Sequence, residues 1–191
     1  PVDILTAVQM HFTRGPLAGQ RVLVTSGPTH EPIDPVRYIA NRSSGRQGSA
    51  IAQALVNQGA DVVFISGPAA ADPPLGAQIT RVETALEMAQ AVEQALPCKI
   101  AIFVAAVADY RVELPGDEKI KKQAGGLSTL SFVENPDILA GVAASERARS
   151  GALFCVGFAA ESHDLLPHAQ AKRARKGVPL LVGNIGPDTF G

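Results

Sequence analysis

The chain has 191 residues, of which 46% are hydrophobic and 18% charged, and its formal net charge is −1 at pH 7. A chain of this length can bury a core of its own, and the composition excludes a disordered protein. Because the net charge is near zero, the protein lacks the overall positive potential that attracts nucleic acid or an anionic membrane surface. No apolar run reaches the roughly 18 residues of a membrane-spanning helix. Cys98 and Cys155 lie in apolar runs, which fits two buried thiols in a reducing, cytoplasmic setting.

The first 20 residues predict a linker helix and a lead-in to the domain that follows. Ile4, Val8 and Phe12 recur every four residues, as on one side of a short amphipathic helix. Gly15-Pro16 then ends that pattern. We expect residues 21–191 to form one nucleotide-binding domain.

From residue 21 onward, apolar strand-like runs alternate with helical segments. The predicted strands cover residues 21–26, 61–66, 100–105, 152–157 and 178–182. The predicted helices cover residues 48–58, 84–96, 135–148 and 164–175. Strands that are apolar on both faces and joined by helices predict an α/β fold, a doubly wound, mostly parallel Rossmann-like sheet with helices on both faces. Ligands bind such sheets at the carboxyl ends of the strands, where the topology switches.

Two helix starts carry their own signals. Thr84 and Glu87 have the spacing of a capping box. Asn135-Pro136-Asp137 predicts an N-cap at Asn135, a proline at the first helical position and an acid in the first turn.

The long loop after the first strand has the residues of an anion site. Ser43, Ser44 and Gly45 precede a predicted helix N-terminus, where backbone N–H groups favour phosphate. Ser44 and Gln47 have capping-box spacing, so Ser44 could equally serve only as a cap. Arg37 and Asn41 would share a face if this stretch is helical, and they offer a guanidinium for an anion and an amide for a carbonyl.

The same loop argues against a dinucleotide site. The fingerprint needs a glycine-rich turn directly after the strand, and Gly45-x-x-Gly48 lies 18 or more residues beyond Gly27. The second strand ends in Ser66, with no acid for a ribose hydroxyl. An NAD(P)-binding reductase domain therefore remains an alternative with little support.

The loop after the third strand is the second candidate region. Small residues precede Asp109, which can accept from sugar hydroxyls or base amines. Lys119, Lys121 and Lys122 precede Gln123–Gly126, a segment suited to a lid, although a lysine run is commonly a solvated face.

Later segments add candidate ligand-binding groups. Phe158 could stack on a base or belong to the core. Lys172 and Lys176 are one helical turn apart and could bind a polyphosphate or complement a helix dipole. The four histidines have no metal-ligand spacing, and no nucleophile elbow is present, which argues against a zinc site or an acyl-hydrolase triad.

Taken in order, these segments resemble the phosphopantothenate–cysteine ligase family, which in bacteria is fused behind a flavin-dependent decarboxylase. The resemblance rests on the motifs at residues 24–29, 35–45, 105–110, 118–122, 135–138, 157–161 and 172–176. It implies activation of the 4′-phosphopantothenate carboxylate by CTP, with Mg²⁺, to an acyl-cytidylate. The amine of cysteine then forms the amide. The resemblance also implies a homodimer with the site at its interface, and FMN only in the decarboxylase half.

The resemblance assigns roles position by position. Asn41 would hold the acyl-cytidylate carbonyl, and Arg37, from the same or the neighbouring subunit, would help to bind phosphopantothenate. Lys119 would contact the phosphates, Asp109 would hold the cytidine, and the alanines at 105 and 106 would lie against the substrate. The remaining CTP contacts would come from Phe103, Val104, Ala105, Val133, Glu134, Asn135, Pro136, Phe158, Lys172 and Lys176. Ligands for the metal are not assigned.

The chain departs from the family pattern at its ends. These 191 residues do not include the decarboxylase half, and family members continue beyond the position of residue 191 with further strand and helix elements. We therefore expect the end of the domain to lie outside this sequence. A non-catalytic nucleotide-binding or dimerisation module is the third hypothesis, after the ligase and the reductase domain.

Overall fold

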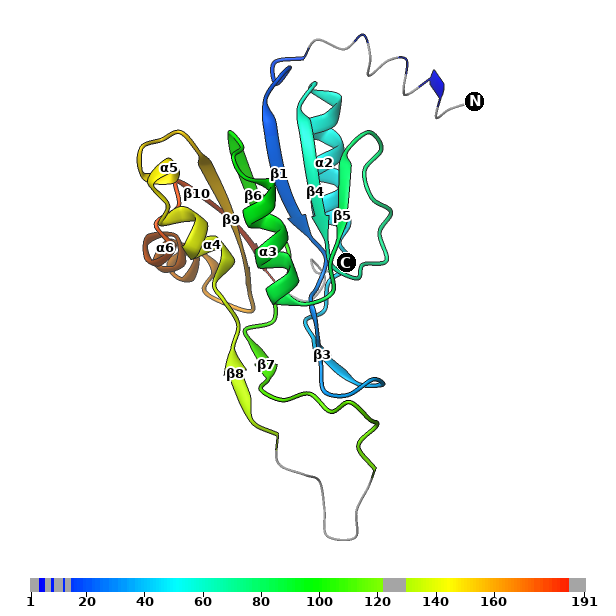
Figure 1. The fold of residues 1–191 in the computed structure, drawn as a ribbon. Helices are drawn as coiled ribbons and strands as arrows, with labels where there is room; N and C mark the ends of the chain where they lie inside the picture. The colour runs from blue at the N-terminus through cyan, green and yellow to red at the C-terminus, as the bar shows by residue number, and fades with distance from the viewer. Residues whose placement is uncertain (1–3, 6–7, 9–11, 13–14, 122–129, 186–191) are drawn as a thin grey trace.

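The computed structural model describes residues 4–5, 8, 12, 15–121 and 130–185. Within these residues, a six-stranded sheet has the order β10-β9-β6-β1-β4-β5, and all neighbouring strands are parallel (Figure 1). Its strands are β1 (Arg21–Ser26), β4 (Asp61–Ser66), β5 (Gln78–Arg81), β6 (Ile100–Phe103), β9 (Phe154–Glu161) and β10 (Leu180–Ile185). From β1 the chain adds β4 and β5 on one side of the sheet, and then β6, β9 and β10 on the other side. This confirms the doubly wound α/β sheet.

Helices cover both faces of this sheet. They are α2 (Arg46–Asn57), α3 (Ala85–Ala95), α4 (Ile138–Ala143), α5 (Glu146–Arg149) and α6 (Leu165–Lys176). Figure 1 shows α3 in front of the sheet and α2 behind it. α6 packs on β9 and β10 at one edge. No helix in the described part of the chain is long and apolar enough to cross a bilayer.

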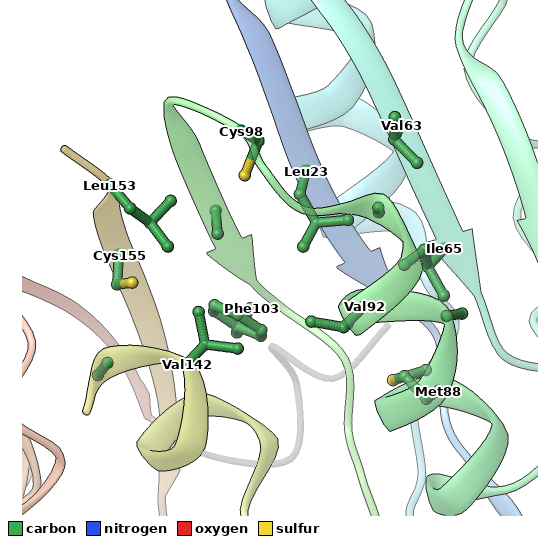
Figure 2. Packing of buried hydrophobic residues seen from close by; sticks show 14 of the residues in the cluster. Leu23, Val63, Ile65, Met88, Val92, Cys98, Phe103, Val142, Leu153 and Cys155 are labelled. Atoms are coloured by element: carbon green, nitrogen blue, oxygen red, sulfur yellow. The ribbon is translucent and has the colours of Figure 1, made fainter. Parts of the chain in front are cut away.

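The core follows from the alternation of side chains along each strand. In β1, Leu23 points into a cluster with Met88 and Val92 of α3, whereas Val22 and Val24 point into a cluster with α2. Figure 2 shows the first cluster, in which Leu23 and Phe103 of the sheet and Val142 of α4 fill the space between the sheet and the helices. The strands lack polar alternation because both faces are buried.

Two antiparallel hairpins extend beyond the carboxyl edge of the sheet, and the sequence did not predict them. One consists of β2 (His30–Pro32) and β3 (Tyr38–Ala40), and the other of β7 (Tyr110–Val112) and β8 (Phe132–Glu134). Figure 1 shows both beyond the strand ends, and β2 packs against β7. Residues 38–40 form a strand, so the helical arrangement considered for Arg37 and Asn41 is wrong.

Two predicted helix details also change, and a third is confirmed. Asp137, not Asn135, is the N-cap of α4, because its carboxylate accepts from Ala140 N. The predicted helix over 135–148 is two helices, since Ser145 caps a new turn by accepting from Ala148 N. The cap at Thr84 is confirmed, with its hydroxyl accepting from Glu87 N.

The lead-in segment is only partly described. Ile4, Leu5, Val8 and Phe12 are helical and exposed, and the rest of the predicted linker helix lies outside the described residues.

Candidate functional site

A cleft of about 1220 Å³ lies at the carboxyl ends of β1, β6 and β9. This is the topological switch point, since β1 and β6 are neighbours although the chain passes through β4 and β5 between them. Single small-molecule pockets measure roughly 300–1,000 Å³, so this cleft has room for more than one substrate. The sequence-predicted residues that line it are Asn41, Phe103, Val104, Ala105, Ala106, Asp109, Glu134, Asn135, Pro136, Phe158, Lys172 and Lys176.

One wall of the cleft is the start of α2. Its N-cap is Gly45, with a φ of 76° and no side chain of its own, and the Ser44 hydroxyl accepts from Arg46 N over 3.3 Å rather than from Gln47 N. The predicted capping box of Ser44 and Gln47 is therefore wrong. The Ser26 hydroxyl, at the end of β1, donates to Gly45 O over 3.0 Å and holds this turn against the sheet. Arg46 N is thus already bonded, and the remaining N–H groups of this helix start, with the helix dipole, favour an anion in the cleft.

The loop after β6 forms the floor of the cleft. Its backbone is tied to the loop after β1, because Ala106 N donates to Gly27 O (2.9 Å) and Ala108 N donates to the Thr29 hydroxyl (3.0 Å). These side chains are alanines, so a ligand can approach the backbone closely. Backbone and threonine hydrogen bonds therefore hold the two loops together.

Asn41 joins this floor from the hairpin side. Its amide nitrogen donates to Val107 O over 2.9 Å and to Ala106 O over 3.4 Å. The amide that the family resemblance assigns to a substrate carbonyl thus already lies beside Ala106. Binding a carbonyl through this nitrogen requires exchange of one of these bonds.

The opposite wall is built around Asn135. Asn135 N donates to Asp109 O (2.8 Å), and its side-chain amide donates to Ala108 O (2.9 Å). Arg111 donates to Glu134 O and to the Asn135 side-chain oxygen, at 2.7 and 3.2 Å. Asn135 is therefore a connector between the loops after β6 and β8 and not a helix cap.

Positive charge enters the cleft from the last turns of α6. Lys172, Arg175 and Lys176 all line the cleft. Burial lowers the pKa of Lys172, while the nearby carboxylates of Glu161 and Asp109 act in the opposite direction. Lys176 forms an ion pair with Asp137 at the start of α4. Three cations on one helix end can neutralise a polyphosphate.

Three predicted site residues lie outside the cleft lining. Val133 belongs to β8, Lys119 is exposed, and Arg37 is bonded to Asp34 and Ile120 O. Lys121 is also exposed, and Lys122 with Gln123–Gly126 lies outside the described residues.

The sequence reasoning also missed residues that line the cleft. Arg175 could have been predicted from the sequence, because it is three residues after Lys172 on the same helix and therefore lies on the same face. Asn184, which donates to the Gln47 side chain across 137 residues of chain, had none.

Comparisons of this sequence with known proteins all indicate the same family. The family of the DNA/pantothenate metabolism flavoprotein C-terminal domain matches residues 17–189. The coenzyme A biosynthesis bifunctional protein CoaBC of Vibrio cholerae is 42% identical over 186 residues, and that of Escherichia coli K12 is 45% identical over 190. Each alignment covers 96% of this chain and 46% of the relative, so the chain spans less than half of those proteins.

Solved structures agree with the fold. The crystal structure of the C-terminal domain of a CoaBC protein superposes with a TM-score of 0.75 at 37% identity, covering 88% of this chain and 78% of that one. A Cab2 mutant in complex with phosphopantothenate-cysteine has a TM-score of 0.69 at 20% identity, with 96% and 77% coverage. The second likeness shows the fold alone.

Proposed function

Because the chain belongs to the family of the DNA/pantothenate metabolism flavoprotein C-terminal domain, we propose that it is a CTP-dependent phosphopantothenate–cysteine ligase. The observation that carries the proposal is the cleft at the switch point. It combines the N-terminus of α2, three cations on α6 and a floor of small residues. The CoaBC relatives, described as bifunctional proteins of coenzyme A biosynthesis, support the same activity.

The reaction has two steps. A carboxylate oxygen of 4′-phosphopantothenate attacks the α-phosphorus of CTP, which forms a P–O bond and releases pyrophosphate. The amine of cysteine then attacks the acyl carbon, a C–N bond forms, and CMP leaves with the C–O electron pair as the amine loses a proton. No nucleophilic side chain is needed, so the protein's task is to position anions and stabilise developing charge. This fits a cleft rich in lysine, arginine and backbone N–H groups.

The nucleotide contacts follow from the cleft walls. Lys172, Arg175 and Lys176 with the start of α2 would bind the phosphates, and Asp109 would accept from the cytidine. Phe158 is half-buried at the cleft and would pack on the base. The backbone of residues 103–105 and of 133–136 would complete the pocket, and exposed Lys119 would reach the phosphates from the rim.

The acyl group would lie on the floor beside Asn41, Ala105 and Ala106. Arg37 would bind the phosphate of phosphopantothenate, and its place outside this cleft supports supply from a second subunit. The hairpins expose Tyr38, Tyr110 and Phe132, which supports a homodimer formed through them.

Magnesium would travel with the nucleotide. The carboxylates lining the cleft are Asp109, Glu134 and Asp137, and Asp137 is paired with Lys176. Among the described residues, no group of three or more histidine, cysteine or acidic side chains could hold a metal. Mg²⁺ bound by one or two carboxylates and the phosphates fits this donor set. FMN and the decarboxylase would belong to a fused partner domain of a cytoplasmic enzyme.

The decisive experiment is pyrophosphate release by the purified protein. We expect release with CTP and 4′-phosphopantothenate, and phosphopantothenoylcysteine when cysteine is added. Lys172→Met should reduce the rate about tenfold or more because it removes a half-buried positive charge from the phosphates. Lys99→Met, at the opposite edge of the sheet, is the matched control and should leave the rate unchanged.

Two results would overturn the proposal. One is thermal stabilisation by NADPH or ATP with none by CTP, which would favour the reductase reading. The other is CTP binding with no pyrophosphate release in the presence of phosphopantothenate, which would favour a non-catalytic module.

A further inference from the structure

Asp34 is a buried carboxylate in the turn between β2 and β3, and none of the roles above uses it. Its side chain is fully inaccessible, whereas its neighbours Pro35 and Val36 are exposed. One oxygen, Oδ1, accepts from Val36 N and Arg37 N, both at 2.9 Å. These bonds form a local turn of the kind that aspartate commonly makes.

The other oxygen of Asp34 reaches across the chain. Oδ2 accepts from Nε and Nη2 of Arg37 and from Ile120 N, the latter over 3.1 Å. Nη2 of Arg37 also donates to Ile120 O over 2.8 Å. Both backbone groups of Ile120 are therefore held by the Asp34–Arg37 pair, although 86 residues separate Asp34 from Ile120.

A carboxylate is required for this arrangement. Both oxygens of an ionised aspartate only accept, so they can face N–H donors on every side. The hydrogen bond from Arg37 is the main influence that keeps the pKa of Asp34 well below its usual range, against the opposing effect of burial. An asparagine would turn an NH₂ group toward either the turn or Ile120, and one set of donors would lose its acceptor.

The pair also fixes which edge of the guanidinium faces outward. Nε and Nη2 of Arg37 point to Asp34 and Ile120, which leaves the Nη1 edge for a ligand anion. Lys119 and Lys121 flank the anchored residue in the chain. A further backbone bond, from Gly116 N to Ile33 O (2.9 Å), ties the same two segments together.

We infer that Asp34 is a positioning residue that orients Arg37 and the Lys119–Lys121 segment as a single unit. It touches no substrate and acts through Arg37 and Lys119. This inference rests on the proposed ligase function, since it concerns the two residues expected to bind phosphopantothenate and the CTP phosphates.

The test compares Asp34→Asn with Glu31→Gln. Glu31 is a second buried carboxylate of the same hairpin, but its hydrogen bond comes from Ala85 N at the start of α3. Amide hydrogen exchange at Ile120, measured by NMR without ligand, reports the anchor directly. We expect Asp34→Asn to accelerate exchange there about tenfold or more, because a charge-assisted bond is lost. Glu31→Gln should leave that amide unchanged.

Kinetics then separate positioning from mere folding. Asp34→Asn should raise the KM for 4′-phosphopantothenate about tenfold, whereas Glu31→Gln keeps the parent value. Ile120→Pro removes the same donor from the other side and should reproduce the KM effect, which covers the case that Asp34→Asn does not fold.

Three outcomes would overturn the inference. They are unchanged Ile120 exchange in folded Asp34→Asn, equal kinetic losses in both carboxylate variants, and faster exchange at Ile120 with no change in either KM or kcat. The exchange measurement needs no substrate, so it remains decisive about the anchor even if the protein proves not to be this ligase.

Discussion

Gly48, in the first turn of α2, allows the helix to lie directly against the end of β1. A Cβ at this position would lie 2.3 Å from Ser26 Oγ and 2.6 Å from Ser26 Cβ. Carbon atoms in contact are usually about 3.5–4.0 Å apart, so Gly48→Ala must push the helix and the strand about 1 Å apart. The Ser26 hydroxyl cannot simply rotate away without losing its bond to Gly45 O.

The expected cost combines two terms. Overpacking a buried contact costs about 1–3 kcal/mol, and alanine recovers up to about 1 kcal/mol through its better helix propensity. A net loss of about 1–2 kcal/mol should lower Tm by roughly 2–8 °C in a chain of this size. Because Gly45 and Gly48 line the cleft, the same shift should weaken the stabilisation of the protein by CTP.

The matched control is Gly141→Ala in α4. A Cβ there meets nothing within 4 Å, so the substitution should stabilise the protein by about 0.5–1 kcal/mol. Urea denaturation followed by circular dichroism measures both variants. A Gly48→Ala protein as stable as the parent, or more stable, would refute the packing argument.

Three further predictions concern stability and the two thiols. Asp137→Ala should lower the free energy of unfolding, measured by urea denaturation, by about 1 kcal/mol, because Asp137 caps α4. The pKa of Asp34 in the folded protein lies below its unfolded value of about 3.9. The ionised carboxylate therefore contributes fully to the free energy of unfolding above that pH, and this contribution is lost as the pH falls further. The Tm of Asp34→Asn should therefore decrease less steeply with falling pH than the Tm of the parent protein. Parallel decreases of the two Tm values would contradict this. Burial raises the pKa of Cys98, and burial with Cys98 nearby raises that of Cys155 to about 11. Neither thiol should react with Ellman's reagent at pH 8 until the protein is unfolded, and rapid reaction of the native protein would be the opposite result.

Much of the sheet could be predicted because its signals are local. β1 and β4 begin and end where the predicted strands at residues 21–26 and 61–66 do, since a strand buried on both faces is recognised by a nearly continuous apolar run. The cap at Thr84 was also visible in four residues of sequence. The rule that ligands bind at the switch point predicted the place of the cleft, and the family resemblance supplied most of the residues that line it.

The hairpins and the detailed site could not be predicted in the same way. The pairing of β7 with β8 and the anchoring of Ile120 by Asp34 join residues far apart in the chain. Asn135 looked like a helix cap from its neighbours, but its amide is used by Ala108 O instead. Local sequence fixes which segments can be strands or helices. Only the tertiary structure decides which polar groups meet, because a buried carboxylate or amide takes whichever partners the folded chain brings to it.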